Sequence, residues 1–236
     1  MGIPVDVDGV WKDAKPYVND NGTWKEAQFA YANVNGTWKQ VFANFNKATG
    51  GTITDVDNYN GTGQKWRVHA FTSNSTFTVQ QNPQPFEVLV VGGGGHGGKG
   101  GWNGVQGDPK RGGGGGNGGG FNRKSGVTLD ATSYSVTVGG GTCKIGPYSA
   151  GQGSGGGTGS GAHGSPGSPT YNTITGSNVA YRQGGATGNG WPDGNGANGA
   201  GRGGGGGGGQ FATASKDNLS GNAGKAGIVV VAYRVG

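Results

Sequence analysis

The chain has 236 residues, and 60 of them, about a quarter, are glycine. Hydrophobic residues make up 31% and charged residues 13%, with a formal net charge of +6. This composition excludes a large apolar core, and the single cysteine, Cys143, excludes an intramolecular disulfide and a cysteine metal cluster. No apolar run of about 18 residues is present, so no helical membrane span or membrane insertion is expected.

The first 45 residues are predicted to form a separate module of β-hairpins. A Trp-Lys motif follows a turn glycine three times, and in two of the three cases that glycine belongs to an Asn-Gly pair, which favours a tight hairpin turn. The motif recurs at residues 10–14, 23–27 and 37–41. One unit is too small to bury its tryptophan alone, so the units are expected to pack on one another or on a partner. The expected core consists of Trp11, Trp24 and Trp38.

Residues 46–61 are predicted to be a linker, because a Gly-Gly pair precedes a stretch rich in Asp and Asn. The stretch 55–61 offers many oxygen ligands, but it does not fit a calcium-binding EF-hand loop. Tyr59 and Asn60 stand where that loop needs a polar ligand and then glycine. A polar turn without a metal ion is therefore expected.

Residues 62–236 are predicted to be an all-β domain. Short runs of β-branched and aromatic residues predict strands, and no segment has the 3.6-residue period of a helix. The predicted strands are residues 65–69, 75–79, 86–91, 133–138 and 228–234.

The glycine tracts have a period of three. The longest in-phase run is Gly92, Gly95, Gly98, Gly101, Gly104, Gly107, and the tract before the last predicted strand repeats the period with Gly221, Gly224, Gly227. A polyproline II helix has three residues per turn and no internal hydrogen bonds, so glycine at every third place leaves one face as bare backbone. Such faces can approach and bond N–H to C=O across the gap. We expect packed polyproline II (polyglycine II) helices here. A flexible linker is the alternative, and the interrupted register excludes collagen.

Nothing in the sequence indicates an enzyme or a cofactor. Residues 93–99 match a phosphate-binding loop, but Gly100 stands where Ser or Thr should hold magnesium. The three histidines, His69, His96 and His163, lie far apart, and no paired carboxylates are evident. Cys143 is expected to be a buried, inert side chain. The basic residues are scattered, so no nucleic-acid partner is expected.

Three segments resemble the glycine-rich domains of phage tail proteins, of the minor tail protein and tail-fibre adhesin type. They are residues 68–79, 86–95 and 224–233. The Trp-Lys repeats look like short modules of phage tail-fibre proteins. The resemblance implies a β-sandwich from which packed glycine helices project, with loops that contact a host-cell receptor.

The resemblance also implies partners and a location. The module at residues 1–45 would attach to other phage tail proteins, and the glycine-rich domain would bind a host cell-surface glycan or protein. Fibres of this kind often form trimers, so a homotrimer is an expectation. The protein would be part of the virion and extracellular after release, since the N-terminus has no signal-peptide pattern. A purely structural minor tail protein and an ice-binding bundle of glycine helices stay open as alternatives.

In an adhesin, the non-glycine residues in the turns of the glycine tracts are expected to contact the receptor. Aromatic rings stack on sugar faces, and Asn and Asp accept hydrogen bonds from hydroxyl groups. Packing within the glycine-helix bundle is the alternative role for the aromatic residues. The candidates are Trp102, Asn103, Phe121, Tyr148, His163, Tyr171, Tyr181, Trp191, Asp193 and Phe211.

Overall fold

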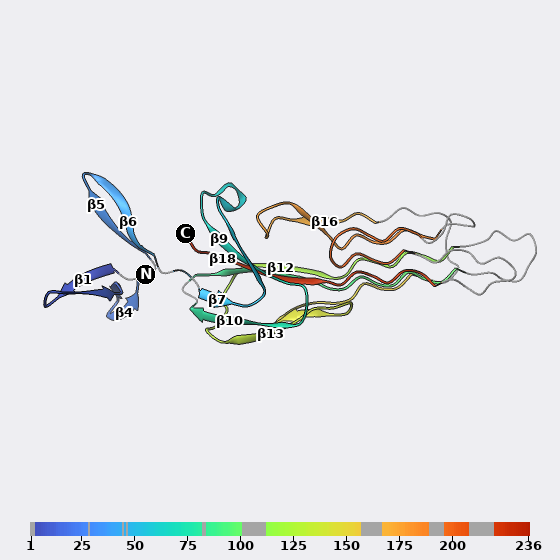
Figure 1. The fold of residues 1–236 in the computed structure, drawn as a ribbon, viewed down its shortest axis with the longest axis horizontal. Helices are drawn as coiled ribbons and strands as arrows, with labels where there is room; N and C mark the ends of the chain where they lie inside the picture. Colours follow the sequence, from blue (N-terminus) through green and yellow to red (C-terminus); the bar gives the residue numbers. More distant parts are fainter. Residues whose placement is uncertain are drawn as a thin grey trace, which may run out of the picture.

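The computed structural model describes residues 3–27, 29–43, 45, 47–81, 84–100, 112–156, 167–188, 196–207 and 220–236. These residues form antiparallel sheets and one short 3-10 turn, η1 (Tyr59–Gly61), with no α-helix among them. The prediction of an all-β fold is therefore confirmed. Figure 1 shows an elongated molecule, with three hairpins at one end, larger sheets in the middle and extended segments that lead toward the other end.

Three two-stranded sheets form the N-terminal end. They pair consecutive strands of the chain: β1 (Ile3–Val7) with β2 (Val10–Ala14), β3 (Tyr17–Asp20) with β4 (Thr23–Glu26), and β5 (Phe29–Val34) with β6 (Thr37–Ala43). Each two-residue turn has positive φ at both central positions, as a type I′ turn requires. The turn pairs are Asp8-Gly9, Asn21-Gly22 and Asn35-Gly36.

The tryptophans of these hairpins do not form the predicted core. Trp24 and Trp38 are each 68% exposed, and the side chain of Trp11 lies outside the described residues. The physical reason is that each hairpin is its own two-stranded sheet. A two-stranded ribbon has no second layer to cover its faces.

Two five-stranded antiparallel sheets form the middle of the molecule. The first has the order β15 (Tyr148–Ala150), β14 (Cys143–Ile145), β13 (Ser133–Thr137), β10 (Ser75–Gln81), β7 (Lys47–Thr49). The second has the order β12 (Phe121–Val127), β11 (Phe86–Val91), β18 (Ile228–Arg234), β9 (Trp66–Phe71), β8 (Thr52–Val56). One core joins them, since Phe77 and Val136 of the first sheet belong to the same buried cluster as Val88 and Val231 of the second.

The second sheet is buried on both faces. Val88 and Val90 of β11 belong to the core shared with the first sheet, whereas Leu89 and Val91 belong to a second buried cluster. The second cluster includes residues of the hairpin formed by β16 (Thr170–Asn172) and β17 (Val179–Tyr181). A strand with two buried faces needs apolar residues at every position, which explains the nearly continuous apolar run at 86–91.

The segment predicted as a linker, residues 46–61, contains two strands instead. β7 pairs with β10, and β8 pairs with β9, each at the edge of its sheet. Most side chains of these edge strands face solvent, so their sequences lack an apolar pattern. Asp55 lies in β8 and accepts two hydrogen bonds from the Arg67 guanidinium, at 2.7 and 2.9 Å. Hydrogen bonding to Arg67 lowers the pKa of the Asp55 carboxyl.

Extended glycine-rich segments continue from the sheets and are joined laterally by backbone hydrogen bonds. Between residues 92–98 and 114–120 these bonds repeat at every third residue, which is the period of the glycines. The pairs, donor first, are Gly92 to Gly120 (2.9 Å), Gly95 to Asn117 (2.9 Å) and Gly98 to Gly114 (2.8 Å).

The segment 92–98 is bonded on several sides. It also donates to Lys225 and Asn222, and it accepts from Gly153 and Gly206. Several partners are needed, because one net hydrogen bond is worth about 0.5–1.5 kcal/mol whereas ordering one residue costs about 1–2 kcal/mol. The segments lie so close that a Cβ built on Gly92 would overlap the Gly151 carbonyl oxygen.

Candidate functional site

The described ends of the glycine-rich segments meet at one end of the molecule. Four undescribed stretches, residues 101–111, 157–166, 189–195 and 208–219, connect these segments. The residues next to the stretches bond to one another: Gly98 to Gly114, Gly156 to His96, Gly188 to Gly113 and Asn222 to Gly207. Three of the connections therefore start and finish at the end that lies opposite the hairpins in Figure 1, and the stretch 157–166 starts there.

Six of the ten predicted receptor-contact residues belong to these connecting stretches and lie outside the described residues. They are Trp102, Asn103, His163, Trp191, Asp193 and Phe211. The structure therefore gives no geometry for them, and their role stays a prediction.

The other four candidates lie on the sheets. Tyr171 in β16 is 59% exposed, so its ring is accessible to a ligand. Tyr148 in β15 is half-buried against the core shared by the two large sheets. Phe121 in β12 is half-buried, and its ring centroid lies 6.4 Å from that of Tyr181, which is only 2% exposed. The structure thus does not bring these four aromatic residues together on one surface.

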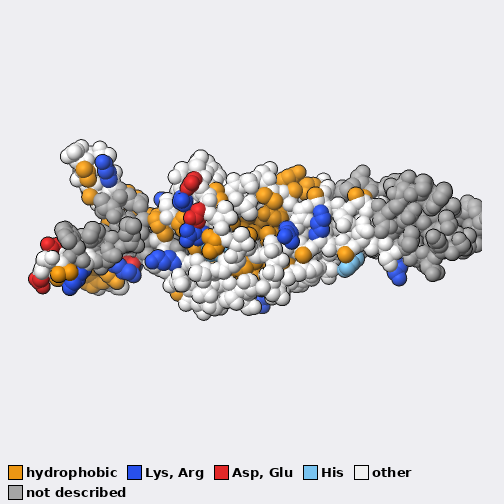
Figure 2. Space-filling view, viewed as in Figure 1, with side chains coloured by type: hydrophobic (Ala, Val, Ile, Leu, Met, Phe, Trp, Pro, Cys, Tyr) orange, Lys and Arg blue, Asp and Glu red, His pale blue; other side chains and the backbone are white. Residues whose placement is uncertain are grey.

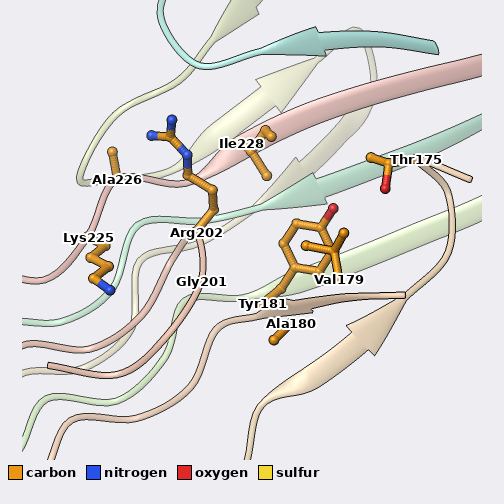
Figure 3. A pocket seen from close by; sticks show the side chains of 9 residues that line it. All are labelled: Thr175, Val179, Ala180, Tyr181, Gly201, Arg202, Lys225, Ala226 and Ile228. Atoms are coloured by element: carbon orange, nitrogen blue, oxygen red, sulfur yellow. The ribbon is translucent and has the colours of Figure 1, made fainter. Parts of the chain in front are cut away.

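A pocket of about 690 Å³ lies beside Tyr181, where the β16–β17 hairpin meets the glycine-rich segments. This volume is within the range of about 300–1,000 Å³ that small-molecule sites occupy. Three parts of the chain that are distant in sequence form the pocket, as Figure 3 shows. Its lining residues are Thr175, Val179, Ala180, Tyr181, Gly201, Arg202, Lys225, Ala226 and Ile228.

The lining of the pocket is partly apolar. Ile228 and Tyr181 belong to the second buried cluster, and Val179 and Phe121 pack against it. Burial raises the pKa of the Tyr181 hydroxyl, and a hydrogen bond with Thr175 acts in the opposite direction. Tyr181 is therefore a neutral hydrogen-bonding group at the edge of an apolar surface.

Two cations complete the pocket. Arg202 and Lys225 are exposed and extend from neighbouring segments, as Figure 3 shows. A backbone hydrogen bond of 2.9 Å from Arg182 to the Arg202 carbonyl fixes the first of these segments against β17. None of the ion pairs found among the described residues involves either side chain.

None of the described residues that line the pocket is acidic. From residue 131 onward the sequence contains only two acids, Asp193 and Asp217, and both belong to undescribed stretches. On the face drawn in Figure 2, the acidic side chains gather toward the hairpins and the large sheets, while basic ones continue onto the glycine-rich part. The described part of this region can therefore attract an anion.

A second, more polar pocket of about 490 Å³ lies nearby. Arg182, which follows Tyr181 in the chain, contributes its one charged side chain among the described residues. Amide and hydroxyl side chains of Asn117, Gln152 and Ser168 also line it. Asn117 already donates to the Ser154 hydroxyl at 2.5 Å, so part of this polar surface is satisfied internally.

The groups most often used in catalysis are buried or dispersed in the described part of the chain. His69 and Cys143 are fully buried, and the Cys143 thiol donates to the Gly139 carbonyl oxygen at 3.8 Å. No three His, Cys, Asp or Glu side chains lie close enough to hold a metal ion in the described ranges. The described residues include no helix with the length and apolar character of a membrane span.

Comparison with known proteins gives a match to a protein family. A family model described as a glycine-rich domain matches residues 70–152, about a third of the chain. This match runs from the end of β9 to the second residue after β15, so it includes parts of both large sheets. A search of curated proteins gives no match to this chain.

Sequence reasoning did not single out Arg202 or Lys225. Each is an isolated cation within a glycine tract, and the pocket forms only because residues from 175 to 228 are brought together by the sheet. The one signal in the sequence is the near absence of acids after residue 130.

Proposed function

We propose that this protein is a phage tail component, and specifically an adhesin of the tail tip or tail fibre that contacts a host cell. The glycine-rich family match supports the domain type, and the resemblance of residues 68–79, 86–95 and 224–233 supports the phage tail class. The finer architecture is part of the proposal: a β-sandwich carries a bundle of polyproline II helices, and residues 1–45 form an attachment module.

The observation that carries the proposal is the meeting of the segment ends. The described residues that flank three of the connecting stretches, and the residue before the fourth, bond to their neighbours at one end, far from the hairpins. In an adhesin these stretches would face one partner, since loops on a rigid scaffold are the usual position of binding residues. The stretches contain Trp102 and Trp191, and both are suited to stacking on a sugar.

The hairpins at residues 1–45 suit the attachment role. Trp24 and Trp38 are exposed, and a two-stranded ribbon gains stability when a partner covers it. We propose that other tail proteins, or further copies in a trimer, provide that cover within the virion.

The test is binding of the purified, fluorescently labelled chain to intact cells of a panel of bacteria and to their extracted envelope glycans. We expect saturable binding that Trp102→Ala or Trp191→Ala abolishes. Trp24→Ala is the matched control, because it removes an exposed tryptophan from the opposite end and should leave binding unchanged.

Circular dichroism of each variant checks that the fold is intact. A well-folded chain that binds none of the cells or glycans would overturn the adhesin proposal, and it would favour a structural tail component that depends on its neighbours.

A further inference from the structure

We propose that the pocket beside Tyr181 binds a sugar that carries an anionic group, a carboxylate or a phosphate. This proposal rests on the proposed adhesin function in one respect: the sugar would come from a glycan of the host envelope. The binding itself is a property of Tyr181, Arg202, Lys225 and their neighbours.

The charge of the ligand follows from the two cations. Arg202 and Lys225 come from different segments, line the same pocket and have no ion pair within the described part of the chain. A guanidinium presents a planar fork of donors that matches the two oxygens of a carboxylate or phosphate, and an ammonium adds a point charge.

The sugar part of the ligand follows from the lining of the pocket. Val179 and Ile228 provide aliphatic side chains. One face of a sugar ring consists of C–H groups and can lie on such side chains. The Thr175 hydroxyl donates to the Ser177 carbonyl at 3.4 Å and borders the same space, so its oxygen can accept a hydrogen bond from a ring hydroxyl.

The scaffold holds these groups in place before a ligand arrives. Tyr181 is buried against Phe121, and Ile228 begins the central strand β18. Lys225 and Arg202 both lie on segments fixed by lateral bonds, since the Lys225 N–H donates to the Gly204 carbonyl at 2.7 Å and the Arg202 carbonyl accepts from Arg182 at 2.9 Å. A preorganised backbone reduces the ordering cost of binding.

The test is a titration of the isotope-labelled full chain with glucuronate, glucose 6-phosphate, glucose and acetate, followed by the amide NMR signals of Ala180, Gly201 and Ala226. We expect glucuronate, glucose 6-phosphate or both to shift these signals in a saturable way. Neutral glucose and acetate should not, because one lacks the charge and the other lacks the ring.

Two variants test the cations. Arg202→Gln and Lys225→Gln should each weaken the binding by about tenfold or more, as expected for the loss of a charged hydrogen bond. Lys144→Gln is the matched control, because it removes the same charge from an exposed position in β14 on the other large sheet. Absence of saturable shifts with both anionic sugars would overturn the proposal, and so would equal weakening by Lys144→Gln.

The two proposals can fail separately. If the chain binds the anionic sugar at this pocket but adsorbs to no cell, the pocket proposal is supported and the adhesin proposal is overturned. If the chain adsorbs through Trp102 and Trp191 but the Ala180 and Gly201 signals stay unchanged in all four titrations, the adhesin proposal is supported and the pocket proposal is overturned.

Discussion

The imidazole Nε2 of His69 lies 3.1 Å from the hydroxyl oxygen of Tyr233, and both side chains are fully buried. The Nδ1 atom lies 2.7 Å from the Gly50 carbonyl oxygen, which can only accept. Nδ1 therefore carries the proton, and Nε2 accepts from the Tyr233 hydroxyl. The Ala48 N–H donates to the same hydroxyl oxygen at 3.1 Å. This network ties β9 and β18 of the second sheet to β7 of the first.

The network predicts that acid weakens the fold. Burial lowers the pKa of His69, because the charged imidazole is poorly solvated there. The unfolded chain, with a histidine pKa of about 6.5, then binds a proton that the folded chain does not. The contribution of His69 to stability is complete above about pH 6.5 and is lost progressively as the pH falls toward the folded pKa. Urea denaturation at a series of pH values should show this decline.

The control for this prediction is His96→Gln, which replaces an exposed histidine and should retain the decline. His69→Gln should reduce it. A direct NMR titration of the His69 imidazole gives an independent check, and titration at or above the ordinary histidine pKa would contradict the prediction.

Gly95→Ala should destabilise the glycine-rich segments. A Cβ at this position would overlap the Ser154 carbonyl oxygen, while the Gly95 N–H and carbonyl already bond to two other segments. Backbone on three sides cannot move aside easily, so we expect a loss of about 1–3 kcal/mol in the free energy of unfolding. Gly139→Ala is the matched control, since a Cβ there would meet nothing within 4 Å and its φ is not positive. Chemical denaturation gives the free energy of unfolding of both variants. An equal loss in Gly95→Ala and Gly139→Ala would contradict the close packing of backbone around Gly95.

Trp24→Ala and Trp38→Ala should each change the stability of the isolated chain by less than about 0.5 kcal/mol, because both side chains are mostly in solvent. Trp66→Ala should cost more. Its ring stacks on Tyr59 with centroids 4.5 Å apart and packs against the second buried cluster. Thermal unfolding of the three variants gives the comparison, and a large loss for Trp24→Ala would mean that the hairpins have a shared core.

The Glu87–Arg123 pair offers a test of coupling within the second sheet. The Glu87 carboxylate accepts from the Arg123 guanidinium at 2.8 Å and from the Tyr59 hydroxyl at 3.1 Å, and it is only 18% exposed. Arg123→Met should cost about 1–3 kcal/mol, because it leaves a largely buried carboxylate without its charged partner. The double variant with Glu87→Gln should cost less than the sum of the two single variants. Lys124→Met, an exposed neighbour, is the control.

The sequence predicts the strands with strong apolar patterns well. Residues 228–234 are β18 over the same bounds, and 86–91 are β11. The strands that it misses are short or at sheet edges, such as β7, β8 and β17, where few apolar positions are needed. The turn residues at Asn21-Gly22 and Asn35-Gly36 also behave as expected, because local backbone conformation decides them.

Side-chain environments are harder to predict than elements. Trp24 and Trp38 look like core residues in the sequence, yet the absence of a second layer over their hairpins leaves them exposed. Tyr181 lies in a polar, glycine-rich context and is buried. The pocket with Arg202 and Lys225 depends on which distant segments become neighbours in the fold, and no local sequence pattern predicts those neighbours.

The position of β18 has a consequence for biosynthesis. This strand follows every other strand of its sheet in the chain, yet it lies at the centre, between β11 and β9. A ribosome must therefore release residues 228–234 before the second sheet can close, and β11 and β9 have no common neighbour until then. Long-range pairing of this kind is slow and exposes apolar edges meanwhile. The nascent chain is therefore expected to expose the facing edges of β11 and β9 until residues 228–234 have emerged.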